Sequence, residues 1–404
     1  MAQQSVIPDG LLTQMLDLGT SMIACGADVN LVEESLVRIG HSYGARDMNV
    51  FVITSSILVT MLDGLGKEHT QSRRIHTALS NNFGRLERLN ALCRRCCDEK
   101  VGPEQIAVEL ERINNSCVSR PYLYVGSVLA AGSFAVFFGG SPLDGVVSAL
   151  FAVLICVLQS RFRPYCPNEI VFDFVAALVS GLGICLAAQV APGLNIDKII
   201  IGDIMLLIPG IAITNAMRDM LAGGCRGAAP HRVTSVGGRT RARLHGRHHG
   251  GGHMTTQALI QLAMAFPASL GFALLFNLRP GLLVPASLGG LFTWAVYLAC
   301  GQLASGVFVP CLVASAFAAV YAQVLAVRFK APLAIFYIVC EIPLIPGSGL
   351  YYTMSYAVQG NAEQALSYGL LTTEFVFAIA FGIAIAWAGG EILRRFLAAR
   401  SAKK

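Results

Sequence analysis

The sequence predicts an α-helical polytopic membrane protein with two inverted five-helix repeats, one helix of which is lost at residues 224–253, preceded by a soluble α+β domain. Three observations predict this fold class. Hydrophobic residues make up 54% of the chain and charged residues only 13%, whereas an average soluble domain has about 25% charged residues. Most acidic side chains fall within residues 1–120. The tetrapeptide Leu-Ile-Pro-Gly occurs twice, at 207–210 and 344–347, 137 positions apart.

Residues 1–118 have the periodicity of a soluble α+β domain. Apolar residues recur at helical spacing near both ends of this region, and short β-branched runs lie between them. About 110 residues are enough for an independent core. The expected elements are helices at 11–25 and 29–41, strands at 48–54, 57–62 and 67–75, and helices at 82–100 and 103–113.

From residue 119 the chain reads as a series of apolar helices. A span of the hydrocarbon layer, which is about 30 Å thick, takes about 20 apolar residues. Four candidate spans form a first repeat at 119–223, and five form a second repeat at 254–396, before a basic tail at 397–404. The segment at 146–159 is long enough only if its flanks contribute. The expected spans are 122–138, 146–159, 170–190, 199–222, 258–277, 282–300, 307–327, 333–358 and 370–388.

The segment at 224–253 does not fit this pattern. The offset between the repeats places the partner of the last span at 233–252, which reads VTSVGGRTRARLHGRHHGGG. Six arginines between 224 and 253 cannot lie in lipid. Arginines and lysines are enriched in cytoplasmic loops. Those that flank the spans of the two halves all lie on the cytoplasmic face only if the chain crosses the membrane once more between Arg218 and Met254. A spanning helix is therefore missing where the repeat requires one.

A reading-frame error would explain the missing helix. One permitted back-translation of 224–253 in another frame gives an apolar sequence able to span a membrane, and Met254-Thr255 then overlaps a stop codon. In this hypothesis 1–223 and 254–404 are two subunits joined by a frameshifted segment. The alternative is a genuine basic linker. Five of the eight histidines fall in it, but no carboxylate or paired-cysteine ligands accompany them, so we expect no metal site.

The composition excludes several other classes of protein. Without the basic segment at 224–253 the chain is formally neutral, so the net charge of +6 indicates no nucleic-acid partner. Cys93, Cys96 and Cys97 lie in an expected basic helix, which favours reduced thiols over a disulfide framework. We see no cleavable signal peptide, no Walker-type phosphate loop and no nucleophile–base pair. We therefore expect neither an enzyme nor a cofactor.

Acidic residues inside apolar spans are costly and therefore indicate function. Asp203 lies six residues before Pro209, and Glu341 lies five before Pro346, so the two hold nearly equivalent places in the repeats. A carboxyl group shielded from water favours its neutral form and could exchange a proton as access alternates. The alternative is a carboxylate near a helix end that reaches interfacial water. Two weaker candidates are Asp173 and Glu374.

The two Pro-Gly pairs, Pro209-Gly210 and Pro346-Gly347, predict interrupted helices. Proline removes a backbone donor, and lipid tolerates such a break only where protein or a water-filled cavity surrounds it. Paired breaks in the two halves of a membrane protein point to a transporter's substrate site. The alternative is two ordinary proline kinks.

Polar residues that follow the breaks are candidate substrate ligands. Amides at a restarted helix favour a carboxylate, and Arg218 could bind one bidentately unless it is only a positive anchor at the cytoplasmic face. No cation follows the second break, which suits a zwitterion or a small acid. The candidates are Thr214, Asn215, Arg218 and Asp219 after the first break, and Ser348, Tyr351, Tyr352 and Thr353 after the second.

Two stretches resemble the threonine/serine exporter family: IGDIMLLIPGIAITNAMRDMLAGG at 201–224 and GADVNLVEESLVRIGHSYGA at 26–45. The second half, with IPLIPGSGLYYTMSYAVQGN at 342–361, is similar to the family's smaller carboxy-terminal module. The resemblance covers nearly the whole chain except 224–253. Some members are single chains. Others are split into two subunits, and the split pair that exports succinate divides where Met254 lies here.

The resemblance implies a multi-pass exporter of the cytoplasmic membrane with ten spans and a cytoplasmic N-terminal domain. Its expected partners are an amino acid or dicarboxylate substrate, protons, the lipid bilayer and, as a homo-oligomer, further copies of the chain. Threonine or serine export is the first hypothesis and succinate export the alternative. A rival from another class is a membrane-anchored sensor or hydrolase, in which the helices only hold the soluble domain.

Overall fold

The computed structural model describes residues 10–53, 55–75, 82–116, 120–166, 169–207, 256–304 and 306–401. These residues are mostly helical, with one small sheet. The chain divides into two compact units by its contacts. The first comprises Met1–Leu123, Leu274–Leu282 and Leu325–Phe336, and the second comprises Tyr124–Ala273, Leu283–Val324 and Tyr337–Lys404.

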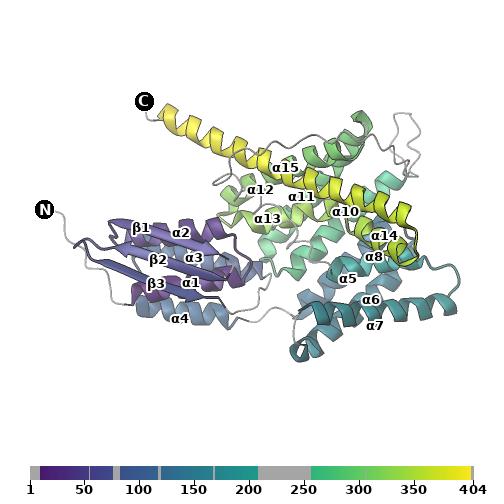
Figure 1. Ribbon diagram of the computed structural model, residues 1–404, viewed down its shortest axis with the longest axis horizontal. Helices are drawn as coiled ribbons and strands as arrows, with labels where there is room; N and C mark the ends of the chain where they lie inside the picture. Colours follow the sequence, from purple (N-terminus) through teal and green to yellow (C-terminus); the bar gives the residue numbers. More distant parts are fainter. Residues whose placement is uncertain are drawn as a thin grey trace. The chain divides into compact units, whose positions relative to one another are not determined.

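The first unit holds the expected α+β elements in the expected order (Figure 1). The strands form an antiparallel sheet in the order β1-β2-β3, with Val50 opposite Val59 and Thr60 opposite Thr70. The elements are α1 (Leu11–Ala24), α2 (Val29–Ser42), β1 (Asp47–Ile53), β2 (Ser56–Leu62), β3 (Glu68–Arg74), α3 (Phe83–Glu99) and α4 (Pro103–Asn114). The third strand and the start of α4 at Pro103 are as predicted.

The core of this unit lies between the helices and one face of the sheet (Figure 1). In β2, Ile57, Val59 and Met61 are buried, whereas Leu58 between them is exposed. This alternation is the two-residue period of a strand with one covered face. Hydrophobic burial against the helices therefore fixes the register of the sheet.

The described cysteines of the first unit, Cys25, Cys93, Cys96 and Cys97, are free thiols. Cys93 and Cys96 are buried on the inner face of α3. Burial raises the pKa of Cys93 to about 12 and that of Cys96 to about 11, chiefly because a thiolate loses its hydration there. Such thiols remain protonated at neutral pH and act as small packing residues.

The second unit consists of helices (Figure 1). Several of these helices have one end in the first unit, because the two units are defined by contacts between residues and not by the ends of helices. The helices are α5 (Arg120–Phe137), α6 (Pro142–Arg161), α7 (Glu169–Val190), α8 (Ile196–Leu207), α10 (Thr256–Leu275), α11 (Pro280–Leu303), α12 (Phe308–Phe329), α13 (Leu333–Glu341), α14 (Gly347–Val358) and α15 (Ala362–Ser401), with short 3₁₀ turns η1 (Arg163–Tyr165) and η2 (Ile342–Leu344).

Among the described residues, six helices are long and apolar enough to cross a membrane, and α13 with α14 forms a seventh, bent span. The six are α6, α7, α10, α11, α12 and α15. All five spans predicted after Met254 are therefore present as helices. Helix α5 is apolar but shorter, and the predicted span at 199–222 is described only as far as Leu207 in α8.

Two helices are longer than the sequence predicts. Helix α6 gains a turn at its start because Ser141 and Asp144 form a capping box and Pro142 occupies the first turn. It thereby reaches 20 residues, so its flanks do contribute. Helix α15 extends past the predicted span at 370–388 on both sides, because its flanks are rich in good helix formers. The predicted basic tail at 397–404 is therefore helical through Ser401.

The anomalous segment at 224–253 lies outside the described residues, as do Pro209 and Gly210 of the first break. The frameshift hypothesis and the basic-linker alternative both concern this segment.

Glycines bring the helices of the second unit into backbone contact. A Cβ on Gly202 of α8 would lie 2.6 Å from the carbonyl oxygen of Ala131 in α5, and one on Gly271 of α10 would lie 2.5 Å from the amide nitrogen of Ala130. A Cβ on Gly382 of α15 would lie 2.6 Å from the carbonyl of Leu312 in α12. Small residues at helix contacts are typical of membrane proteins, where close packing holds helices together.

Gly202→Ala is expected to destabilise the protein by about 1–3 kcal/mol, because the added methyl group collides with backbone that cannot rotate away. The measurement is the midpoint temperature of thermal unfolding in detergent. Gly181→Ala on α7 is the matched control, since no atom beyond the adjacent backbone of its own helix lies within 4 Å of its Cβ position. Equal unfolding temperatures for the two variants would contradict the close packing of α8 on α5.

Candidate functional site

Glu341 is the most deeply buried carboxyl group of the predicted site. It is the last residue of α13 and is 1% exposed. Ser315 of α12 places its Oγ 2.8 Å from Oε1 of Glu341, and Tyr337, one turn earlier on α13, interacts with the same carboxyl group. An acidic side chain in this setting needs such partners because no water replaces them.

The Ser315 hydroxyl has two oxygens within hydrogen-bond distance. Besides Glu341 Oε1, the carbonyl oxygen of Ile379 in α15 lies 3.0 Å from its Oγ. A serine hydroxyl carries a single hydrogen but can also accept. Both contacts are therefore full hydrogen bonds at once only when Glu341 is protonated and donates to Ser315. Ionisation of Glu341 draws the hydroxyl hydrogen away from Ile379, so the geometry couples the charge of Glu341 to a contact with α15.

Asp203 is the second buried carboxyl group, on α8, and is 2% exposed. The Ser148 hydroxyl of α6 donates to its Oδ1 at 2.9 Å. Its Oδ2 is buried and has no hydrogen-bond partner among the residues that the structure describes. The neighbouring Gly202 allows this approach, because a Cβ there would lie 2.6 Å from the Ser148 Oγ.

The second predicted helix break is present. Helix α13 ends at Glu341, the turn η2 contains Pro343, and α14 starts at Gly347 after Pro346. The axes of the two helical parts differ by 49°. Pro343 and Pro346 cannot donate the backbone hydrogen bonds that would continue α13, which explains the interruption. The break therefore begins at the buried carboxyl group itself.

Helix α8 packs against the start of α14. A Cβ on Gly347 would lie 2.2 Å from the Met205 Sδ, two residues beyond Asp203. A side chain at position 347 would therefore force the Met205 side chain of α8 to move. The structure thus brings the residues that precede the first Leu-Ile-Pro-Gly sequence next to the second one.

Two polar contacts link the start of α8 to α14. The Tyr351 hydroxyl donates to Asp197 Oδ1 at 2.8 Å. The Lys198 Nζ donates to the Tyr352 hydroxyl at 3.2 Å and lies 5.6 Å from the centre of that ring. Tyr352 in turn packs on Tyr368 of α15, with ring centroids 5.2 Å apart. This group of charged and aromatic side chains ties α8, α14 and α15 together.

The remaining candidates are placed less centrally or are not described. Ser348 and Tyr351 are half-buried on α14. The Thr353 hydroxyl donates to the Gly349 carbonyl of its own helix at 2.7 Å. Asp173 is half-buried on α7, and Glu374 is exposed on α15. Six candidates lie outside the described residues: Pro209, Gly210, Thr214, Asn215, Arg218 and Asp219.

Sequence reasoning did not single out Ser148, Ser315 or Tyr337, because isolated hydroxyl residues in apolar helices carry no distinctive pattern. The sequence does carry a signal for Asp197 and Lys198. They form a charged pair at the start of an apolar helix, where a charge needs a partner or water.

No group of three potential metal ligands is found in the described ranges of the chain. The polar centre instead consists of carboxyl and hydroxyl groups beside a broken membrane helix. Buried carboxyl groups next to a discontinuous span are typical of secondary transporters. Fold and site together thus define a polytopic membrane protein of the transporter class.

Comparison with known families agrees with this class. Residues 14–229 match the family described as "Putative threonine/serine exporter", and residues 261–388 match the family described as "Threonine/Serine exporter, ThrE". The chain therefore belongs to the threonine/serine exporter family, with both modules in one polypeptide, as the resemblance predicted. Searches of curated proteins and of solved structures gave no significant match. Residues 230–260 fall in neither family match.

Asp197→Asn and Tyr351→Phe are each expected to lower the stability of the purified protein by about 1 kcal/mol, because each removes the same charge-assisted hydrogen bond. The double variant should lose little more than either single variant, since the shared contact is already gone. Unfolding temperatures of the three variants in detergent measure this coupling. Tyr165→Phe is the control, since Tyr165 is 84% exposed. Strictly additive losses would contradict the contact.

Proposed function

We propose that this protein is a secondary transporter that exports threonine, serine or similar small hydrophilic acids across the cytoplasmic membrane, coupled to proton movement. The observation that carries the proposal is the buried Glu341 carboxyl group, which sits at the break between α13 and α14. Membership of the threonine/serine exporter family supports the substrate class.

Proton coupling needs a group that gains and loses a proton as access alternates between the two sides. Glu341 suits this role because Ser315 can donate to its ionised form or accept from its protonated form. Asp203 has a similar setting, with Ser148 as its hydroxyl partner. Each carboxyl group can thus change its charge without losing every hydrogen bond.

Alternating access requires two halves that move against each other. We infer that 119–223 and 254–396 are inverted repeats. Five spans are expected in each once the helix missing at 224–253 is counted, and an odd number of spans reverses the direction of the second copy. The contacts of α8 with α14 join the two halves near both carboxyl groups. Rocking of the halves about this contact would move Asp203 and Glu341 between the two aqueous sides.

The start of α14 is suited to bind a substrate carboxylate. Gly347 and Gly349 are buried in its first turn, and no side chain caps the helix at Pro346. Backbone amides at a helix N-terminus carry partial positive charge and attract anions. The corresponding segment after the first break, including Arg218, completes the proposed site from the other half.

The same chemistry would accept a dicarboxylate such as succinate. The two family matches cover separate modules of the chain, as expected for relatives that occur as two subunits. Efflux assays with both threonine and succinate distinguish the two substrates, because an amino acid transporter must also accommodate the ammonium group.

We propose that the N-terminal domain is cytoplasmic. The first unit contains this domain together with the segments Leu274–Leu282 and Leu325–Phe336. These segments carry Arg279, Arg328 and Lys330, and arginine and lysine are enriched in cytoplasmic loops.

Asp203→Asn and Glu341→Gln are each expected to reduce proton-coupled export at least tenfold, because neither amide can release a proton. The measurement is efflux of labelled threonine from vesicles over a range of external pH. Residual transport by either variant should depend less on pH than wild-type transport. The matched control is Glu363→Gln, an exposed carboxylate in the first turn of α15.

These outcomes are read at equal amounts of protein in the membrane, measured by immunoblot. Wild-type rates with an unchanged pH profile in both carboxyl variants would refute the coupling role. Loss of transport in the control variant Glu363→Gln as well would indicate that removing a carboxylate impairs folding wherever it lies, and would contradict a specific role for Asp203 and Glu341.

We further propose that a fifth span of the first repeat is replaced by the basic segment at 224–253. Residues 230–260 fall in neither family match, in agreement with a segment foreign to the family. We expect the nucleotide sequence across codons 220–256 to contain a frame change. Read in the correct frame, it should encode a further apolar helix and the end of one chain followed by the start of a second. An uninterrupted frame, confirmed by peptide mass spectrometry of an active exporter, would refute this.

A further inference from the structure

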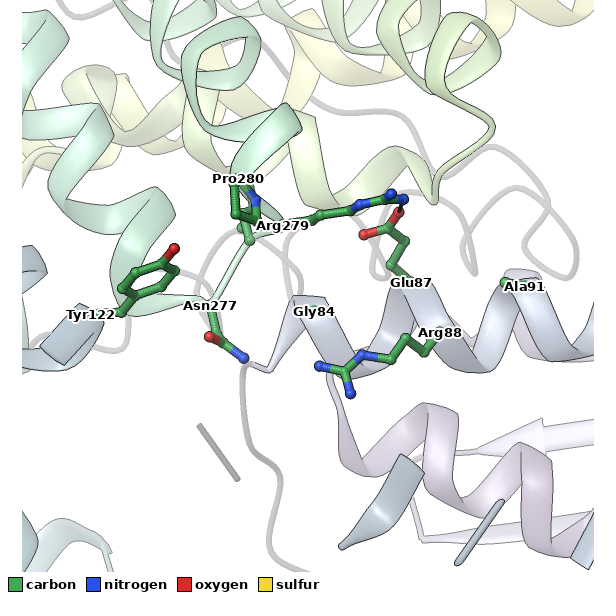
Figure 2. Close-up of a pocket in the computed structure, with 9 residues that line it drawn as sticks. Gly84, Glu87, Arg88, Ala91, Tyr122, Asn277, Arg279 and Pro280 are labelled. Carbon is green, nitrogen blue, oxygen red and sulfur yellow. Dashed lines mark ion pairs between the residues drawn. The ribbon is translucent and has the colours of Figure 1, made fainter. Parts of the chain in front are cut away.

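A pocket in the first unit is lined by α3 of the N-terminal domain and by residues at the starts of the apolar helices α5 and α11 (Figure 2). It has a volume of about 400 Å³, within the range of small-molecule sites. Its walls are the first turns of α3 and the segment between α10 and α11. The lining residues are Gly84, Glu87, Arg88, Ala91, Tyr122, Asn277, Leu278, Arg279 and Pro280.

The walls of this pocket are held together by backbone contacts. The Phe83 amide donates to the Phe276 carbonyl at 3.0 Å, and the two phenyl rings pack with centroids 5.1 Å apart. A Cβ on Gly84 would lie 2.3 Å from the Asn277 carbonyl oxygen, so only glycine allows this approach. The pocket is therefore a formed concave site whose two sides come from distant parts of the sequence.

The lining combines charges of both signs (Figure 2). The Arg279 guanidinium lies 3.6 Å from Glu87 Oε1, beyond the length of a strong charge-assisted hydrogen bond. Its side chain is 73% exposed, so donors of the guanidinium remain available to a ligand. Arg88 adds a second exposed guanidinium on α3.

We propose that this pocket is a binding site for a small zwitterionic amino acid, separate from the transport pathway. Arg279 would bind the ligand carboxylate, and Glu87 its ammonium group. A dicarboxylate fits less well, because its second carboxylate would face Glu87. The ligand class follows from these charges, whereas the choice of threonine as the probe rests on the proposed function.

Binding here would have a mechanical consequence. A ligand held by Glu87 on one wall and Arg279 on the other bridges α3 and the segment that joins α10 to α11. Occupancy would therefore stiffen the N-terminal domain against the ends of two spans. The pocket would in this way let the domain respond to the amino acid on the side from which export begins.

The test uses the purified full-length protein in lipid nanodiscs, with L-threonine as ligand and succinate for comparison. Hydrogen–deuterium exchange reports the site directly, because threonine should slow exchange at residues 83–91 and 276–279. Arg279→Gln should weaken this protection at least tenfold in threonine concentration. Ala91→Trp, which fills the pocket without removing a charge, should abolish it. Arg112→Gln, an exposed arginine of α4 outside the pocket, is the matched control.

Two results would overturn the proposal. One is the absence of threonine protection at these residues in the wild-type protein, and the other is protection that persists in both Arg279→Gln and Ala91→Trp. Stronger protection by succinate than by threonine would refute the zwitterion assignment. The double variant Asp203→Asn, Glu341→Gln separates this site from the proposed function, because protection at the pocket should remain there whether or not transport is lost.

Discussion

The absence of water from the hydrocarbon layer is the constraint on which the rest of this structure depends. A buried carboxyl group or an interrupted helix must find its partners within the protein. Glu341 is subject to both constraints, because its carboxyl group is buried and it is the last residue of α13 before the break. Its Oε1 is hydrogen-bonded to Ser315. Helices therefore have to pack closely around it, and glycines such as Gly382 provide that approach. The glycine contacts and the hydroxyl–carboxyl pairs are two consequences of the same requirement.

Local sequence signals predicted most of the fold because they act within one element. Apolar runs of spanning length identified α10, α11 and α12, and the two-residue period of Ile57, Val59 and Met61 identified β2. Helix ends were predicted less well. The extra turn of α6 depends on a capping box, and α15 continues well past the apolar stretch. Hydropathy marks where lipid can surround a helix, whereas backbone hydrogen bonding decides where the helix ends.

The candidate site was only partly predictable for a related reason. An acidic residue in an apolar span is conspicuous, so Asp203 and Glu341 could be identified from the sequence. Their partners could not, because Ser148 and Ser315 become partners only through the rotation and packing of α6 and α12. The pocket beside α3 had no sequence signal either, since its walls come from segments almost 200 positions apart. Chemistry that depends on packing between helices is visible only in three dimensions.

The two carboxyl groups occupy similar chain positions but have different surroundings. Ser148 belongs to α6, the second predicted span, whereas Ser315 belongs to α12, the third span after Met254. Ser315 also reaches the Ile379 carbonyl of α15, so the fifth span of the second half supports the Glu341 pair. The proposed repeat assigns the counterpart of α15 to 233–252. Asp203 Oδ2 and Glu341 Oε2 both lack a hydrogen-bond partner among the described residues, so the difference between the two sites is the contact with α15, and a restored fifth span in the first half would provide the counterpart of that contact.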